Sequence, residues 1–150
     1  MAERFRYRQR VRYHECDPQG VVFNGHYLAY FDVGMTELWR EVGGYEEMIA
    51  AGTDMVVAEA QVSYRAPLRF DDEFDVTIAV TRLGQSSMTS SLALERDGET
   101  VTEGELRHVF VTAGEGDKIS IPDGVRSGLA PFLAEPAAST AGEAHEPRPA

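Results

Sequence analysis

The sequence predicts an α+β fold in which a curved, five-stranded antiparallel sheet wraps around one long central helix. Three observations support this prediction. The periodicity changes along the chain in the order one strand, one helix, four strands. The predicted helix, residues 25–42, is apolar on most sides, and 150 residues suffice for a single core. Such a helix is buried in so small a domain only if a strongly curved sheet encloses it, with help from a second copy of the chain.

The first part of the chain contains a strand, a turn and the helix. Residues 4–13 alternate arginine with mostly apolar side chains, which is the period-two pattern of a strand. Proline and glycine within residues 17–20 predict a turn. Asn24 is the expected N-cap of the helix, and Gly43-Gly44 is the expected C-terminal stop.

The second part of the chain is mostly strand. A short helix is expected at residues 46–51, followed by strands at residues 55–65, 74–80, 87–95 and 100–112. Gly84-Gln85 and Asp97-Gly98 are the expected hairpin turns, and residues 119–133 suit a loop with one helical turn. We therefore expect one domain, residues 1–133, and a disordered tail, residues 134–150, which is rich in Pro, Ala, Glu and Gly.

The net charge of −11 argues against general affinity for nucleic acid, which requires clustered basic side chains. The local exception is one face of the first strand, with Arg4, Arg6, Arg8, Arg10 and Arg12. These arginines suit either a phosphate-binding stripe or a solvated sheet face, and we favour the second interpretation. The acids expected opposite them on neighbouring strands are Glu59, Glu73, Asp75, Glu103 and Glu105.

The chain shows neither a signal-peptide pattern nor a membrane-length apolar stretch. Its single cysteine, Cys16, excludes an intrachain disulfide and fits a reducing compartment. We therefore expect a cytoplasmic protein with neither a nucleic-acid nor a membrane partner.

Metal and cofactor motifs are not evident. The four histidines lack HExxH spacing, there is no cysteine cluster, and no glycine-rich phosphate loop occurs. We expect chemistry without metal or cofactor. Cys16 with His14 or His26 as its base would be a thiol nucleophile, but free cysteines are more often small buried residues.

Asp17 precedes the predicted turn and lies a few residues ahead of the helix start, where free N–H groups carry partial positive charge. A thioester whose carbonyl oxygen faced the N–H of Asn24 or Gly25 would have its developing oxyanion stabilised, while Asp17 attacked or activated water. The alternative is an aspartate that starts an Asp-Pro turn by bonding its own backbone. From chemistry alone that alternative is favoured.

Two stretches of sequence resemble the 4-hydroxybenzoyl-CoA thioesterase branch of the hot-dog superfamily and related bacterial acyl-CoA thioesterases. The first is residues 12–32, RYHECDPQGVVFNGHYLAYFD, and the second is residues 62–72, VSYRAPLRFDD. With the strand–helix–four-strand order, the resemblance covers about residues 4–112. It implies a hot-dog fold, dimers that pair their sheets edge to edge, frequent homotetramers, and active sites at the dimer interface.

The resemblance also implies an activity, the hydrolysis of an acyl-CoA to free acid and CoA. Asp17 would be nucleophile or general base, and the helix-start amide at Asn24 would polarise the thioester carbonyl. Gly25, His26 and Tyr27 would contact substrate, although His26 suits a packed neutral ring equally well. Arg65, Arg69 and Arg82 are candidates for the nucleotide part of CoA, or else outward strand charges. Asp32 is a secondary catalytic candidate, because other lineages carry an acid on the helix.

Two other functions are compatible with this fold. A hot-dog dehydratase or hydratase would use an Asp-x-Asn-Pro motif, which is absent. A non-catalytic acyl-CoA-binding module would have no need of a carboxylate facing the thioester. The acyl group, and the choice between CoA and a carrier-protein thioester, stay open.

Overall fold

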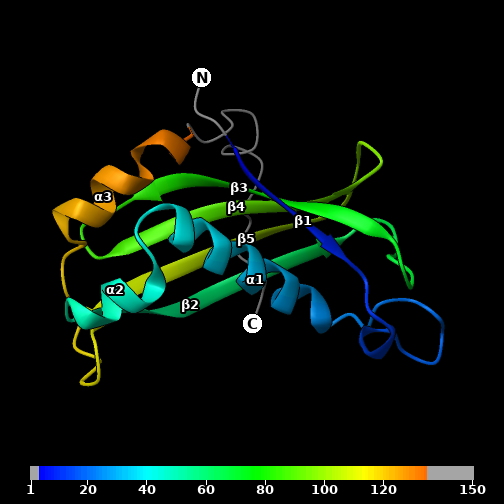
Figure 1. The fold of residues 1–150 in the computed structure, drawn as a ribbon, viewed down its shortest axis with the longest axis horizontal. Helices are drawn as coiled ribbons and strands as arrows, with labels where there is room; N and C mark the ends of the chain where they lie inside the picture. The colour runs from blue at the N-terminus through cyan, green and yellow to red at the C-terminus, as the bar shows by residue number, and fades with distance from the viewer. Residues whose placement is uncertain (1–3, 135–150) are drawn as a thin grey trace, which may run out of the picture.

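A computed structural model describes residues 4–134 of the chain. Five strands form one antiparallel sheet in the order β1-β3-β4-β5-β2, and helix α1 lies across one face of it (Figure 1). The predicted hot-dog architecture and the order of elements are confirmed. The strands are β1 (Phe5–Arg10), β2 (Thr53–Tyr64), β3 (Glu73–Leu83), β4 (Ser87–Arg96) and β5 (Glu99–Thr112). The helices are η1 (Tyr13–Glu15), α1 (His26–Glu41), α2 (Tyr45–Ala50), α3 (Asp123–Leu129) and η2 (Ala130–Phe132).

Helix α1 is fixed to the sheet by a close approach at Gly34. A Cβ at this position would lie 2.7 Å from Cγ1 of Val76 on β3, so only glycine lets the backbone come this near. The opposite side of α1 is open, with Leu28 and Val33 exposed. The sheet of one chain therefore covers one side of the helix, and the expected help from a second copy of the chain stays a prediction.

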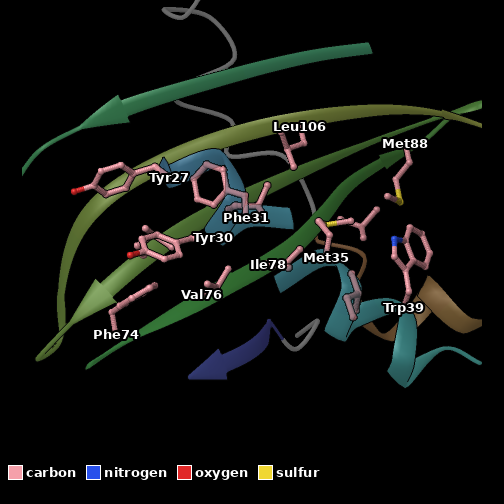
Figure 2. Close-up of a cluster of buried hydrophobic side chains, with 14 of the residues drawn as sticks. Tyr27, Tyr30, Phe31, Met35, Trp39, Phe74, Val76, Ile78, Met88 and Leu106 are labelled. Carbon is pink, nitrogen blue, oxygen red and sulfur yellow. The ribbon is translucent and has the colours of Figure 1, made fainter. Parts of the chain in front are cut away.

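The core fills the space between α1 and the sheet. Figure 2 shows Tyr27, Tyr30 and Phe74 at one end of this cluster and Met88 and Trp39 at the other. Tyr30 and Phe74 pack with ring centroids 4.7 Å apart, which joins the start of α1 to the start of β3. The N-terminal turn of the helix is therefore held rigidly on the sheet.

The turns follow the sequence closely. Asp97 and Gly98 both adopt positive φ, 52° and 80°, as a two-residue hairpin between β4 and β5 requires. Gly43 and Gly44, with φ of 122° and 99°, end α1 as expected. The prediction of Asn24 as the N-cap of α1 is wrong by one residue, because Gly25 occupies the N-cap position. No side chain makes a capping hydrogen bond there.

The arginines of β1 make ion pairs on the outer face of the sheet. Arg6 and Arg8 both bond the carboxylate of Asp75, and Arg10 bonds Glu73. The interpretation as a solvated, paired face is confirmed for these three arginines. Of the other acids expected there, Glu103 pairs with Arg65 and Glu59 with Arg107, at the other edge of the sheet, where β5 and β2 lie.

Strand β2 forms one edge of the sheet, hydrogen-bonded to β5 alone. Its central residues are exposed on both faces, with Val56 and Val57 about half accessible, 50% and 49%. A sheet edge of this kind is open to pairing with another strand.

The C-terminal part of the described chain packs beside β3. Residues 119–133 contain α3 and η2, slightly more helix than the one turn expected. Ala134 donates a 2.7 Å hydrogen bond to the carbonyl of Val80. The rest of the predicted tail lies outside the described residues. Within residues 4–134, no helix combines the length and hydropathy needed to cross a bilayer.

Candidate active site

A small hairpin connects η1 to α1 and carries the residues of interest. Cys16 and Val22 form an antiparallel bridge, the N–H of Asp17 donates to the carbonyl of Val21 at 2.8 Å, and the N–H of Phe23 donates to the carbonyl of Glu15 at 3.0 Å. A further bond, from the N–H of Val22 to the carbonyl of Leu68, attaches the hairpin to the corner between β2 and β3. Asp17 therefore follows the Cys16–Val22 bridge directly and begins the turn of the hairpin.

Asp17 lies at the turn of this hairpin and is partly buried. Its Oδ1 accepts a 2.8 Å hydrogen bond from the N–H of Gln19, and its carbonyl accepts one from Gly20. This is the Asx-turn geometry that the sequence suggests for an Asp-Pro turn. One carboxylate oxygen is thereby fixed. Within residues 4–134, no hydrogen bond links Asp17 to Asn24, Gly25 or His26.

The backbone just before α1 presents two free donors. The N–H groups of Asn24 and Gly25 have no acceptor among the residues that the structure describes, and both residues are exposed. Free N–H groups at a helix N-terminus, reinforced by the helix dipole, are suited to an anionic or polarised oxygen. The donors postulated from sequence are therefore present and unoccupied by the protein itself.

An open pocket of about 280 Å³ lies beside Asn24, the residue that carries the first of these donors. Asn24 and Tyr27 line it from the α1 side, and Tyr64 and Pro67 from the end of β2 and the corner that follows. The Tyr27 and Tyr64 rings meet edge to face with centroids 5.1 Å apart. Tyr27 is otherwise a core residue: its hydroxyl accepts a hydrogen bond from the N–H of Leu68, and burial raises its pKa. The pocket suits an acyl group or a thiol chain.

His26 takes part in a buried cluster that sequence reasoning missed. Its Nε2 lies 3.1 Å from Oε2 of Glu15, while Oε1 of Glu15 accepts hydrogen bonds from the hydroxyl of Tyr30 and the N–H of Arg12. Glu15 lies within residues 12–32 but matches no recognisable catalytic motif by itself. The sequence feature that could have indicated this cluster is an acid two residues before Asp17 together with a histidine at the start of the helix.

A protein-family model described as the Thioesterase-like superfamily matches residues 11–129. The chain belongs to this superfamily. A putative esterase of Aquifex aeolicus is 32% identical over 119 residues, covering 79% of this chain and 91% of the relative. The acyl-CoA thioester hydrolase YbgC of Escherichia coli is 28% identical over 109 residues, covering 71% and 81%. A crystal structure of a hypothetical protein from Aquifex aeolicus superposes with a TM-score of 0.80 at 32% identity, covering 83% and 98%.

The three arginine candidates of this thioesterase-like chain lie in different places. Arg65 lines the pocket and pairs with Glu103 at 2.7 Å. Arg69 is bridged to Val21, so it lies against the Asp17 hairpin. Arg82 is near the far end of β3, nine residues beyond Glu73, or about 30 Å along the strand. Within one chain, Arg82 is therefore remote from the helix start.

Two other candidates have ordinary surroundings. The sulfur of Cys16 is 3.9 Å from the carbonyl oxygen of Arg12, and of its two possible bases, His26 is engaged by Glu15. Asp32 lies on the exposed side of α1, where its carbonyl accepts a hydrogen bond from the hydroxyl of Thr36. Among residues 4–134, no group of three or more His, Cys, Asp or Glu side chains is arranged to hold a metal ion.

Proposed function

We propose that this chain hydrolyses an acyl-CoA thioester to a free acid and CoA, with Asp17 as the catalytic carboxylate. The observation that carries the proposal is the pair of unoccupied N–H groups, at Asn24 and Gly25, beside a pocket and next to the hairpin of Asp17. Membership of the Thioesterase-like superfamily and the likeness to YbgC support thioester hydrolysis, with acyl-CoA as the substrate class.

The proposed reaction places the thioester carbonyl oxygen on the two N–H groups. As negative charge develops on that oxygen, the preorganised donors and the dipole of α1 stabilise it, an effect worth about 3–4 kcal/mol for one such donor. Asp17 either attacks the carbonyl carbon, forming a mixed anhydride that water then hydrolyses to the free acid, or takes a proton from the attacking water; in both routes the C–S bond breaks and the CoA thiolate departs. Neither a metal nor a cofactor enters this scheme; CoA is part of the substrate.

The Asx turn is compatible with this role. Because the N–H of Gln19 holds Oδ1 of Asp17, the carboxylate has a fixed orientation, and Oδ2 is the oxygen available for chemistry. A fixed orientation favours reaction by avoiding the entropy cost of aligning the group.

We propose a homodimer as the minimal unit and a homotetramer as the larger assembly. The exposed edge of β2 can form hydrogen bonds with β2 of a second copy, and this pairing would cover Val56 and Val57. Tyr64, at the end of the same strand, lines the pocket, so such pairing would place the site next to the subunit interface. Arg65 and Arg69 are the proposed contacts for the CoA phosphates.

The decisive experiment is a thiol-release assay with a panel of acyl-CoAs on the wild type and on Asp17→Asn. We expect kcat/KM of the variant to fall at least a thousandfold, with an unchanged circular dichroism spectrum and unchanged mass in solution. Asp17→Asn keeps the acceptor for Gln19, so the turn itself is preserved. A variant that turned over at near wild-type rates would refute the catalytic role of Asp17.

The donor role is tested by a matched pair at Gly25. Its φ of −68° is one that proline adopts, so Gly25→Pro removes the N–H, while Gly25→Ala keeps it. Both substitutions place a Cβ 2.9 Å from the ring of Phe23, so that contact is common to both. Proline also restricts the torsions of Asn24 in the Phe23–His26 turn, so the circular dichroism spectrum and Tm of both variants are measured alongside. We expect kcat of the proline variant to be on the order of a hundredfold below that of the alanine variant. Equal rates would remove the Gly25 N–H from the mechanism.

The second candidate function is a non-catalytic acyl-CoA-binding module. The observation that favours it is the Asx turn, because a turn role alone would explain Asp17. In that case calorimetry would detect binding of acyl-CoA by the wild type and by Asp17→Asn alike, and no thiol would be released by either protein.

A further inference from the structure

Glu15 is a charged side chain at the junction of η1 and α1, and only 8% of it is exposed. Its Oε1 accepts a 2.8 Å hydrogen bond from the hydroxyl of Tyr30 and a 2.6 Å hydrogen bond from the N–H of Arg12. Its Oε2 lies 3.1 Å from Nε2 of His26. One carboxylate thus joins the segment before Asp17 to two successive turns of α1.

The carboxylate is ionised despite its burial. Burial alone would raise the pKa of Glu15, but the hydrogen bonds from the Arg12 N–H and Tyr30, together with His26, outweigh it and leave the pKa below its ordinary value. The pKa of Tyr30 is raised by burial and by Glu15, so its hydroxyl stays a donor. Because an ionised carboxylate accepts only, Nε2 of His26 carries the proton in this pair.

Glu15 also holds the other arm of the hairpin. Its backbone carbonyl accepts the N–H of Phe23 at 3.0 Å, and Phe23 directly precedes Asn24. Its side chain reaches the first residue of α1, His26, which directly follows Gly25. The free N–H groups of Asn24 and Gly25 therefore lie between two points that are both attached to Glu15, and Asp17 is two residues away along the chain.

We propose that Glu15 is a positioning residue, which sets the separation between the Asp17 carboxylate and the N–H groups of Asn24 and Gly25 by holding Phe23, His26 and Tyr30. This role rests on the proposed function, in which those groups carry out the hydrolysis. A buried ion of this kind is weak as a source of stability, because apolar groups of similar volume serve as well. It is effective at fixing a geometry, because its hydrogen bonds are charge-assisted and directional.

The charged and titratable groups around the cluster come from three elements. His14 of η1 meets the His26 ring edge to face, with centroids 6.5 Å apart, and Tyr30 of α1 lies 4.9 Å from the same ring. Arg8 and Arg10 of β1 line the small cavity, about 230 Å³, on which Glu15 and His26 open. The arginines of β1 make their ion pairs on the outer face of the sheet, which leaves the Nε2–H of His26 as the side-chain donor that faces Oε2 of Glu15.

The test is Glu15→Gln, which keeps an acceptor for Arg12 and Tyr30 but removes the charge that faces His26. We expect kcat to fall ten- to a hundredfold with KM changed less than threefold, because a misplacement of about 1 Å costs this much in rate. Nitrogen NMR of the His26 ring should show the proton on Nε2 in the wild type and a mixture of tautomers in the variant. The tautomer shift shows that the substitution releases His26; a purely structural role would lower stability and shift the tautomer without moving kcat.

A matched pair of tyrosines provides the control. Tyr30→Phe removes one donor to Glu15, while Tyr45→Phe removes a comparable 2.8 Å hydrogen bond, to Asp54, at the distant α2. We expect kcat to fall in the first variant and to stay at the wild-type value in the second. If Glu15→Gln does not fold, the Tyr30→Phe variant tests the positioning role in its place.

The two proposals fail in different ways. If Asp17→Asn retains full activity, the catalytic role proposed for Asp17 is wrong. If Asp17→Asn is inactive but Glu15→Gln and Tyr30→Phe keep the wild-type kcat, the proposed function stands and the positioning role of Glu15 is overturned.

Discussion

The hydroxyl of Tyr64, at the end of β2, donates a 2.7 Å hydrogen bond to the backbone carbonyl of Asn24. This bond ties the edge strand to the peptide group whose N–H is the free donor of Gly25. It therefore couples the strand proposed to form the subunit interface to the donors proposed to bind the thioester. The pocket lies between these two residues.

Tyr64→Phe should weaken catalysis more than stability. The ring still packs on Tyr27, so we expect the free energy of unfolding to fall by about 0.5 kcal/mol, the low end for a half-exposed hydrogen bond. The Asn24 peptide loses its restraint, and kcat should fall on the order of tenfold. Steady-state thiol release and urea denaturation measure the two effects. A variant with wild-type kcat would show that the bond does not orient the site.

The order of elements could be predicted from sequence because its signals are local. Period-two alternation, the Asp97-Gly98 pair and the glycines after α1 act over a few residues, and the structure follows them. The open side of α1 could not be predicted, because the apolar side chains of a helix do not reveal whether its own sheet or a second chain covers them.

The site was predictable only in part. The turn of Asp17 and the free donors before α1 follow from residues adjacent in sequence. The Glu15 cluster depends on partners 11 and 15 residues away, whose contact requires the hairpin and the helix rotation to be known. Arg65, Arg69 and Arg82 share only that they are basic side chains near the surface, and the sequence pattern does not say which end of the sheet each of them occupies.

Gly104→Ala should destabilise the fold. A Cβ at this position on β5 would collide with the ring of Phe31 and lie 2.8 Å from the carbonyl oxygen of Gln61, so α1 and β2 would both have to move. We expect a loss of roughly 1–3 kcal/mol and a Tm lower by several degrees. Gly124→Ala, in α3 with no atom within 4 Å of the new Cβ, is the control and should be neutral or slightly stabilising. Equal Tm values would contradict the close packing of α1 on β5.

Val57→Lys should prevent assembly if dimers form along β2. The new charge would lie on the exposed edge strand, where pairing with a second copy would bury it. We expect analytical ultracentrifugation to show that the variant is a monomer. We also expect its rate of thiol release to fall, because the site is proposed to lie next to the subunit interface. Ala130→Lys introduces a lysine at an exposed residue of η2, on neither β2 nor α1, and should leave the dimer intact. A wild-type protein that is already monomeric would contradict the proposed assembly.

The stability of the fold should decrease in mild acid because of His108. This residue of β5 is 4% exposed, its Nδ1 has no partner among the described residues, and burial lowers its pKa from 6.5 to about 4. Between about pH 4 and 6.5 the unfolded chain therefore binds a proton that the folded chain does not. The free energy of unfolding rises with pH over this range, and this contribution to stability is lost as pH falls through it. The full effect is at most about 3 kcal/mol.

Urea denaturation at a fixed protein concentration, repeated between pH 4.5 and 7.5, measures this slope, and His108→Leu should flatten it. The carboxylate of Glu15 acts in a different range: because its pKa is lowered from 4.5, its contribution is lost only as pH falls below that value. The two groups are therefore separable by pH. A slope above pH 4.5 that persists unchanged in His108→Leu would show that the buried imidazole is not its source.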